Sequence, residues 1–445
     1  MKKFNQLLVV TLIAVTTTYF VWFALIFWAY LTTKSVISTS IVAGLQLVIT
    51  AVTSVWFGSI VDNNKKKTAM LGSSLATLLL FSIGLAFFSL QPESAFLLVS
   101  NAPFLVFLII LLLGSAAGNM YNIAVPTLIG LVVPEKERDR ANGLFGTVTG
   151  ISIALTSVAS GFILAYGGMS GVLLAGIGGT LLAIVALLLI PVPEKRIVHI
   201  SEKPEKEGKS DIAKTIAAIN AVPGLFALIL FITLNNFLGG VFMGLMDAYG
   251  LNLVSVEVWG SLFGVLSLGF IASGVYIAKK GVGKSPLRTL FLANLAAWSV
   301  CIFFPLQPSI ILVAIGNFFW ICLFPFMQAA EATIFQKVVP PERLGRIFGF
   351  ARGVESAASP ITAFLIGPIA ELVFIPFMTT GKGVELIGDW FGVGVGRGIA
   401  LVFIMAGIIG LTVTIIAMRS KPYKLLSDHY EKPAEEKPAI AEKRE

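Results

Sequence analysis

Three charged side chains lie within apolar segments that are long enough to cross a membrane: Glu331, Arg352 and Glu355. A charge at the centre of a membrane helix costs about 2.5 to 3.5 kcal/mol, so such residues are retained with ionic partners or beside a wet cavity. At 1.5 Å per residue, Glu331 lies about 9 Å from Lys337 and Arg352 about 9 Å from Arg346. These equal depths predict an ion pair across a helix hairpin. Glu355 follows one turn deeper, on the same helix face as Arg352.

One arginine with two acids has the chemistry of a proton carrier. We hypothesise that a carboxylate, Glu355 first and Glu331 second, takes up a proton in one access state and releases it in the other, when Arg352 is near. The alternative is an ion network that only holds the two helices together. The two histidines, His199 and His429, fall in polar segments, so a relay within the membrane has to use carboxylates.

A second group lies at the end of an earlier apolar segment, in the stretch GSIVDNNKKK that begins at Gly58. Gly58 precedes Asp62 by one helical turn, and a small residue there allows close approach of a neighbouring helix. Asp62 can then cap that helix's N-terminus, where the helix dipole favours negative charge. With Lys66 of the basic cluster, these residues predict a conformational latch. The corresponding stretch from Gly274 has Ala278 in place of the acid, which leaves one latch.

The composition is that of a polytopic membrane protein. Hydrophobic residues make up 56% of the 445 positions and charged residues 13%, whereas soluble domains carry about a quarter charged residues. The net charge of +8 does not indicate a nucleic-acid partner, because the basic residues lie between the apolar segments. A membrane helix needs about 20 apolar residues. Twelve such segments are predicted, at 7–31, 37–61, 69–90, 103–126, 142–166, 171–191, 219–246, 257–278, 287–305, 309–336, 346–376 and 398–418.

An internal repeat relates the two halves of the chain. At a constant offset, the loop VPEKERDRANG matches VPPERLGRIFG in four residues, each time between two long apolar segments. Parallel repeats of this kind are typical of transporters. We therefore predict an all-α membrane protein of twelve transmembrane helices in two six-helix repeats. The predicted parts are an N-terminal bundle (1–191), a cytoplasmic linker (192–218), a C-terminal bundle (219–420) and a disordered cytoplasmic tail (421–445).

The distribution of basic residues predicts the orientation in the membrane. Of the 32 Lys and Arg residues, Lys34, Lys382 and Arg397 fall in loops on one face, Arg352 falls inside a segment, and all others lie on the face that holds both termini. Cytoplasmic loops carry the excess of Lys and Arg. Both termini are therefore predicted to be cytoplasmic, in the cell (inner) membrane. The long Gly-rich outer loop from Glu371 is expected to contain a short interfacial helix near Trp390.

Several other functions are excluded by the sequence. The string GVGKS at Gly281 imitates a phosphate-binding loop, but the required earlier glycine is Ala278 and a membrane helix, not a strand, precedes it. The two cysteines, Cys301 and Cys322, lie in apolar runs and predict no metal cluster. An enzyme site, a cofactor and a channel filter are therefore not expected.

The basic stretch after Gly58 and the repeated VPEKERDRANGLFG loop resemble those of the Major Facilitator Superfamily, and more narrowly its macrolide-efflux-type drug exporters, over essentially the whole chain. The resemblance implies a monomeric transporter that exports lipophilic small molecules by alternating access in exchange for protons. The fourth segment (GSAAGNMYNIAVP) has no arginine, however, and the fifth has no Gly-Pro pair. The alternative of a facilitator or importer of another small metabolite, without proton coupling, stays open.

In the fold of that superfamily, segments one, four and seven border the central cavity. The resemblance therefore implies that their polar and aromatic residues contact substrate, because amides orient a ligand and aromatic rings offer broad surfaces. For each residue the alternative is packing between helices. Asp247 and Glu257 bracket an outer loop and are expected to be solvated. The candidate cavity residues are Tyr19, Trp22, Asn119, Tyr121, Asn122, Asn235 and Asn236.

Overall fold

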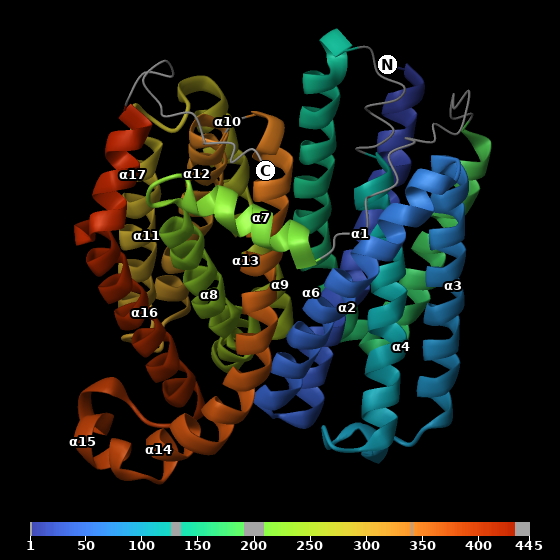
Figure 1. Ribbon diagram of the computed structural model, residues 1–445. Helices are drawn as coiled ribbons and strands as arrows, with labels where there is room; N and C mark the ends of the chain where they lie inside the picture. The colour runs from blue at the N-terminus through green and yellow to red at the C-terminus, as the bar shows by residue number, and fades with distance from the viewer. Residues whose placement is uncertain (1, 126–134, 191–208, 340, 432–445) are drawn as a thin grey trace. The chain divides into compact units, whose positions relative to one another are not determined.

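The computed structural model describes residues 2–125, 135–190, 209–339 and 341–431 (Figure 1). Throughout these ranges the chain is helical, with no β-strand, which confirms the predicted all-α class. The N-terminal helices are α1 (Lys2–Thr33), α2 (Val36–Asn63), α3 (Lys66–Leu90), the 3-10 helix η1 (Glu93–Phe96), α4 (Ala102–Gly118) and α6 (Glu135–Leu189). The helical path of α4 resumes after a turn at Asn119 and continues to Val125.

The C-terminal part of the chain adds long helices and several short ones. They are α7 (Lys209–Asn220), α8 (Leu225–Leu253), α9 (Val256–Leu266), α10 (Leu268–Lys280), α11 (Pro286–Phe303), α12 (Ile310–Val338), α13 (Pro341–Ile369), the π-helix η2 (Ala370–Phe374), α14 (Ile375–Thr379), α15 (Lys382–Phe391), α16 (Val395–Arg419) and α17 (Lys421–Glu431). The short helix α15 lies where one was expected around Trp390.

Eleven helical segments of the described chain are long and apolar enough to cross a membrane. One of them, Val148–Leu189, has 42 residues, which at 1.5 Å per residue is about twice the hydrocarbon thickness of a bilayer. It is interrupted at Gly168, whose φ of 59° and ψ of −168° suit glycine alone. Two spans therefore meet at Gly168, and the total agrees with the predicted twelve.

Residue contacts divide the chain into two compact units. Unit 1 comprises Met1–Ser201, Met243–Ile271 and Ala363–Pro376, and unit 2 comprises Glu202–Phe242, Ala272–Thr362 and Phe377–Glu445. The predicted bundles divide at a single linker, whereas α8, α10 and α13 each contribute to both units. The unit boundaries fall within helices because α9 packs on α6, and the π-helix after α13 meets α2, at one end of unit 1.

The interior of unit 1 contains an aromatic cluster at one end of α1. Trp28 stacks on Phe104 with 5.8 Å between ring centroids. Phe88, Phe96 and Phe107 meet the same indole at steep angles, 5.2 to 5.9 Å away. Such ring pairs are worth about 0.5 to 1.5 kcal/mol each beyond the area they bury. The cluster thus fixes α1 against α3, η1 and α4.

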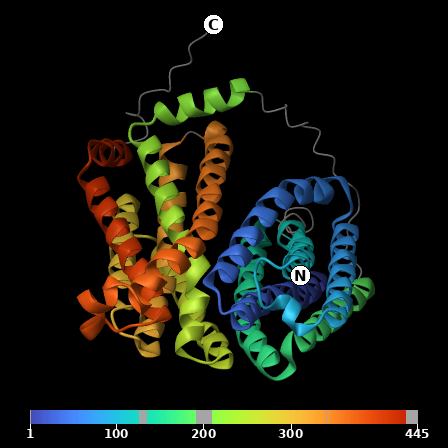
Figure 2. The same ribbon diagram turned by 90° about the horizontal axis from the view of Figure 1, so that it is seen from below.

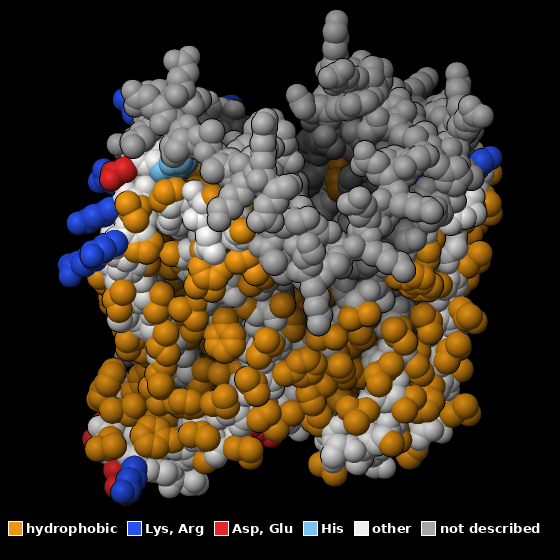
Figure 3. Space-filling view, in the orientation of Figure 1, with side chains coloured by type: hydrophobic (Ala, Val, Ile, Leu, Met, Phe, Trp, Pro, Cys, Tyr) orange, Lys and Arg blue, Asp and Glu red, His pale blue; other side chains and the backbone are white. Residues whose placement is uncertain are grey.

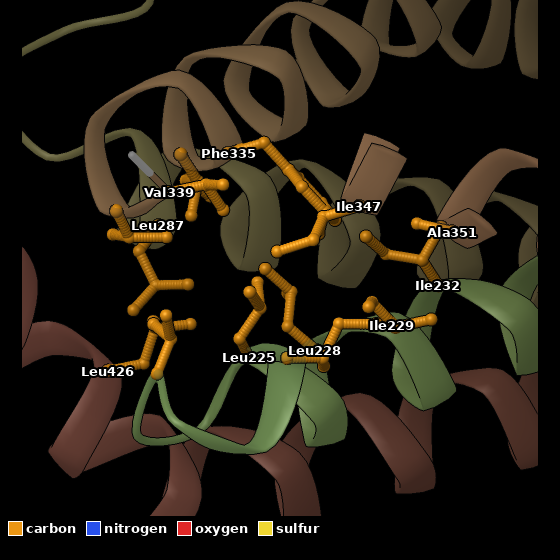
Figure 4. Close-up of a cluster of buried hydrophobic side chains, with 14 of the residues drawn as sticks. Leu225, Leu228, Ile229, Ile232, Leu287, Phe335, Val339, Ile347, Ala351 and Leu426 are labelled. Atoms are coloured by element: carbon orange, nitrogen blue, oxygen red, sulfur yellow. The ribbon is translucent and has the colours of Figure 1, made fainter. Parts of the chain in front are cut away.

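The core of unit 2 joins α8, α11, α12 and α13 at the end that also holds α17 (Figure 4). Leu426 of α17 is only 1% exposed in this cluster, and Tyr423 meets Phe291 edge-on at 5.0 Å. The prediction of a disordered tail is therefore wrong for the first eleven residues of the tail, which are helical. Leu426 and Tyr423 pack in the unit 2 core, whereas Leu425 is 53% exposed. This packing stabilises a sequence that is polar on average.

The second part of the predicted linker is also helical. In Figures 1 and 2, α7 runs across the end of α8 and not along it. Ala218 and Ile219 at the end of α7 are buried in the same cluster as Leu426. Gly224 permits the sharp turn into α8 with a φ of 81°, and a Cβ there would lie 2.3 Å from the carbonyl oxygen of Pro422. The linker therefore ends in a packed helix.

The charged side chains on the surface of unit 2 lie near the ends of its spans (Figure 3). Figure 3 shows hydrophobic side chains over the middle of this unit and a group of Lys and Arg side chains at the end that carries α17. A smaller charged group lies at the end that carries α15. This asymmetry follows the distribution of basic residues on which the predicted orientation depends.

Glycines allow α6 and α9 to pack backbone to backbone in unit 1. A Cβ on Gly260 would lie 2.4 Å from the carbonyl oxygen of Ser157 and 3.2 Å from the Cα of Gly161. Gly260→Ala is therefore expected to lower the free energy of unfolding by about 1 to 3 kcal/mol, because the helices must separate. Thermal denaturation of the purified protein measures the effect.

Gly150 provides the matched control on α6, since a Cβ there meets nothing within 4 Å. Gly150→Ala should leave the melting temperature unchanged or raise it slightly, because alanine is the better helix former. Equal melting temperatures for the two variants would show that the close packing of α6 and α9 does not limit stability.

Candidate functional site

The spans of the first repeat are almost free of charge. Four of them, Gln6–Thr33, Val36–Thr53, Ala102–Val125 and Val148–Leu189, contain no Asp, Glu, Lys or Arg. The remaining span carries Lys66 and Lys67, both in its first turn. Hydrogen-bonding groups within this part of the membrane are therefore hydroxyls, amides and indoles.

One face of α1 is less buried than the rest of the helix. Thr16, Tyr19 and Trp22 follow one another at three-residue spacing and are half-buried, while Val15, Phe20 and Val21 are buried. The indole Nε1 of Trp22 and the hydroxyl of Thr16 are enclosed, and within the described part of the chain neither has a hydrogen-bond partner. Polar groups enclosed in this way normally find a partner, so Thr16 and Trp22 are candidates for contact with a ligand.

The predicted residues Tyr19, Asn119 and Asn122 come together on α1 and at the end of α4. The amide nitrogen of Asn122 donates to the Tyr19 hydroxyl at 3.0 Å and to the Asn119 Oδ1 at 2.6 Å. The helix breaks here because Asn119 caps α4, its N–H bonding back to Ala116 and Ala117. This break turns the two amides toward α1.

Tyr121 lies elsewhere. Its side chain is 1% exposed, and its hydroxyl lies 2.9 Å from the hydroxyl of Ser74 on α3. With Thr18, Thr77 and other residues it lines a small internal pocket between α1, α3, α4 and α6. Its position favours the alternative of helix packing over contact with substrate.

The two asparagines of the seventh span have partners within unit 2. Asn235 donates to the carbonyl of Phe231 and accepts from the indole of Trp298 on α11, both at 2.7 Å. Asn236 donates to the carbonyl of Ile232 at 3.1 Å, and its own carbonyl accepts from Ser359 on α13 at 2.8 Å. Asn235 thus joins α8 to α11, and Asn236 joins α8 to α13.

The two predicted coupling acids are buried in unit 2. Glu331 on α12 is 5% exposed and Glu355 on α13 is 2% exposed. Glu331 directly follows Ala330, and Glu355 lies one helical turn after Ala351. Both alanines belong to the core of unit 2. The side chain of Arg352 lies outside the described residues, so its pairing with Glu331 stays a prediction.

The predicted latch is described only at Lys66, because the side-chain surroundings of Gly58 and Asp62 lie outside the described residues. Lys66 is 4% exposed and donates from Nζ to the carbonyls of Val61 and Asn64. Lysine at this position satisfies carbonyls that the end of α2 leaves without helical partners. Lys66 therefore caps α2 and is not a solvated charge.

Three charged residues have roles that the sequence did not predict. Asp247 accepts from the indole of Trp259 at 3.0 Å, so it is not a freely solvated loop residue. Arg397 is 4% exposed and bonds to the carbonyls after α11. Glu371 reaches the start of α2. The apolar run LVFIPF that follows Glu371 is the signal that places it inside a hydrophobic segment.

The apolar spans of the described chain, with a neutral hydrogen-bonding face in the first repeat and buried acids in the second, are typical of a multi-pass membrane transporter. The chain belongs to the Major Facilitator Superfamily, whose family model matches residues 7–363. This confirms the predicted family.

Relatives of this chain carry the name Macrolide efflux protein A. That of Streptococcus pyogenes is 23% identical over 364 residues, which cover 79% of this chain and 85% of the relative. That of Enterococcus faecalis is 23% identical over 318 residues, which cover 68% of this chain and 92% of the relative. General membrane transport and a relation to efflux proteins follow from these matches.

Solved structures show the same fold. A bacterial homologue of the human lysosomal transporter Spinster superposes with a TM-score of 0.64 at 16% identity, covering 96% of this chain and 98% of the other. The nucleoside transporter NupG gives 0.65 at 12% identity, with 93% and 99% covered. A D-xylose-proton symporter gives 0.62 at 12% identity, with 92% and 97% covered. At these identities the likeness concerns the fold alone.

Proposed function

We propose that this protein exports lipophilic small molecules by alternating access, in exchange for protons. The observation that carries the proposal is the face of α1 in which the Trp22 indole and the Thr16 hydroxyl are enclosed without partners in the described chain. Tyr19 and the amides of Asn119 and Asn122 extend the same polar group. A substrate that fits this face is largely apolar and has hydrogen-bond acceptors.

The charge distribution supports a division of tasks between the two repeats. The first repeat offers a neutral surface that favours no charged substrate, while the second holds the buried acids Glu331 and Glu355. A buried carboxylate that changes its protonation between access states couples a proton to the substrate without touching it. The efflux relatives support export as the direction. Cytoplasmic termini and a monomeric state are part of the proposal.

The second candidate is a facilitator without proton coupling. The first repeat favours the facilitator, because its spans have no acidic side chain that could carry a proton. In that case Glu331 and Glu355 only hold α12 and α13 in place.

Proton movement in proteoliposomes distinguishes the two functions. A pH-sensitive dye inside the liposomes reports protons while a panel of macrolides, lipophilic cations and neutral metabolites is added in turn. Antiport predicts that at least one lipophilic compound moves protons. A compound that crosses without moving protons establishes the facilitator instead, and a panel in which only a neutral metabolite crosses overturns the drug-export proposal.

Trp22 provides a direct test of the proposed binding face. Trp22→Phe keeps an aromatic ring and removes the indole N–H, so the KM for a transported macrolide should rise about three- to tenfold, the value of one hydrogen bond. Trp56→Phe is the matched control, because Trp56 on α2 is 64% exposed on the surface. An unchanged KM for Trp22→Phe would remove Trp22 from the substrate site.

A further inference from the structure

Helices of the two repeats meet at the end of unit 1 that lies opposite the N-terminus. The carboxylate of Glu371, in the π-helix η2, accepts the hydroxyl hydrogen of Ser35 with an O–O distance of 2.5 Å. The same oxygen accepts the backbone N–H of Ile37 at 3.2 Å. Glu371 is thus bound to the first turn of α2, more than three hundred residues earlier in the sequence.

The chemistry of this contact suits a carboxylate. The first N–H groups of a helix have no helical partner, and the helix dipole places partial positive charge there. Ser35 already caps α2 by accepting from the Ile37 N–H at 3.2 Å. Glu371 adds a negative charge and a second acceptor to the same N–H, and hydrogen bonds to an ionised acceptor are the stronger kind.

The local structure places Glu371 for this contact. Its turn is a π-helix, a geometry that shifts the direction of the side chains in a helix and is frequent at functional positions. Glu371 is half-buried, and Tyr30 at the end of α1 lies within electrostatic reach of its carboxylate. Tyr30 is itself hydrogen-bonded to Asn252 of α8. The neighbours of the Glu371 carboxylate in these contacts are therefore polar groups without charge.

The remaining contacts between these helices are neutral and close. Thr39 of α2 donates to the carbonyl of Gly244 on α8 at 2.7 Å. A Cβ on Gly367 of α13 would lie 2.5 Å from the hydroxyl of Ser40, and a Cβ on Gly44 would lie 2.9 Å from the ring of Phe364. Small residues let these helices approach one another closely. The bond from Glu371 to α2 adds a charge-assisted contact to this interface.

We propose that Glu371 is a positioning residue of the transport cycle, whose carboxylate holds the end of α13 against the N-terminus of α2 and keeps this end of unit 1 closed. The end opens when the carboxylate releases Ser35 and Ile37. The proposal rests on the alternating-access part of the proposed function and requires no particular substrate. It places a second latch at the end opposite the one predicted at Asp62.

Chemical labelling of a cysteine tests the latch. Ser40→Cys places a thiol at a position that is fully buried in this interface, in a background where Cys301 and Cys322 are replaced by alanine. A maleimide is added to the purified protein, and the labelling rate measures how often the interface opens. Because no substrate is present, the result is independent of which compound the protein transports.

Glu371→Gln and Ser35→Ala should each raise the labelling rate of the introduced thiol about fivefold or more, through loss of a charge-assisted bond at the helix N-terminus. The double variant should label more slowly than the two single effects together predict, because both changes remove the hydrogen bond between Ser35 and Glu371. Glu93→Gln is the control, since Glu93 is an exposed acid of η1, and it should label like the parent.

Labelling of Glu371→Gln within twofold of the Glu93→Gln control overturns the proposal. Additive effects in the double variant overturn it as well, because they show that Ser35 and Glu371 act separately. Melting temperatures are measured in parallel, and Ser35→Ala keeps the test decisive if Glu371→Gln does not fold.

Discussion

Glu355→Gln is expected to reduce macrolide-driven proton movement to the level of empty liposomes. Glutamine has nearly the same shape as glutamate but cannot bind and release a proton, so a carrier residue loses its function entirely. Glu355 is 2% exposed on α13, where water does not replace it. The measurement uses the pH-dye assay with a macrolide as the transported compound and includes Glu331→Gln, which should retain partial coupling.

The control for this prediction is Glu385→Gln, an exposed acid on α15 that should behave as the wild type. Melting temperatures of all three variants are needed to separate coupling from stability. If Glu331→Gln and Glu355→Gln move protons like the wild type but melt at lower temperature, the acids form a structural ion network. That outcome would place proton coupling at a group other than these two acids.

Arg397→Ala is expected to lower the free energy of unfolding by about 2 to 4 kcal/mol, because two carbonyls lose a charged donor and each acceptor left unsatisfied costs about 1 to 3 kcal/mol. One guanidinium nitrogen donates to the carbonyls of Pro305 and Leu306, both at 2.9 Å. The guanidinium carbon also lies 3.8 Å from the ring centroid of Phe391. Arg397 therefore fastens α16 to the turn between α11 and α12 and to the short helix α15.

Arg397→Lys tests whether geometry or charge matters at this position. Lysine keeps the charge but lacks the planar group that stacks on Phe391 while it donates to two carbonyls, so a loss of about 1 to 2 kcal/mol is expected. Arg419→Lys, an exposed position at the far end of the same helix, is the control. Thermal denaturation in detergent measures all three. A wild-type melting temperature for Arg397→Ala would contradict the structural role of this residue.

Most of the fold was predictable because apolar length alone defines a membrane span. The predicted segment 69–90 is α3 (Lys66–Leu90), and the predicted segment 309–336 is α12 (Ile310–Val338). Helix α17 was not predicted, because its composition is polar and its packing involves few apolar residues, among them Leu426 and Tyr423. Such a short amphipathic segment becomes a helix through tertiary contacts, which local sequence patterns do not contain.

The sequence predicted which residue types line the candidate site, but not the hydrogen-bond partners of those residues. The sequence identifies Asn235 as a polar residue of a cavity-lining span, yet its partner Trp298 lies on another helix and could not be inferred from spacing. The sequence also places Glu371 in a loop, because a charge normally marks the end of a span. Only the fold brings it to Ser35, where the helix N-terminus compensates for its burial.

The docking of α17 has a practical consequence for work with this protein. Leu426 covers Leu225 and Leu287 at the end of unit 2 (Figure 4). A chain shortened to end at Ser420 would leave these side chains uncovered. Affinity tags and fluorescent fusions are therefore best attached beyond Glu431, where the added chain leaves α17 on its partners.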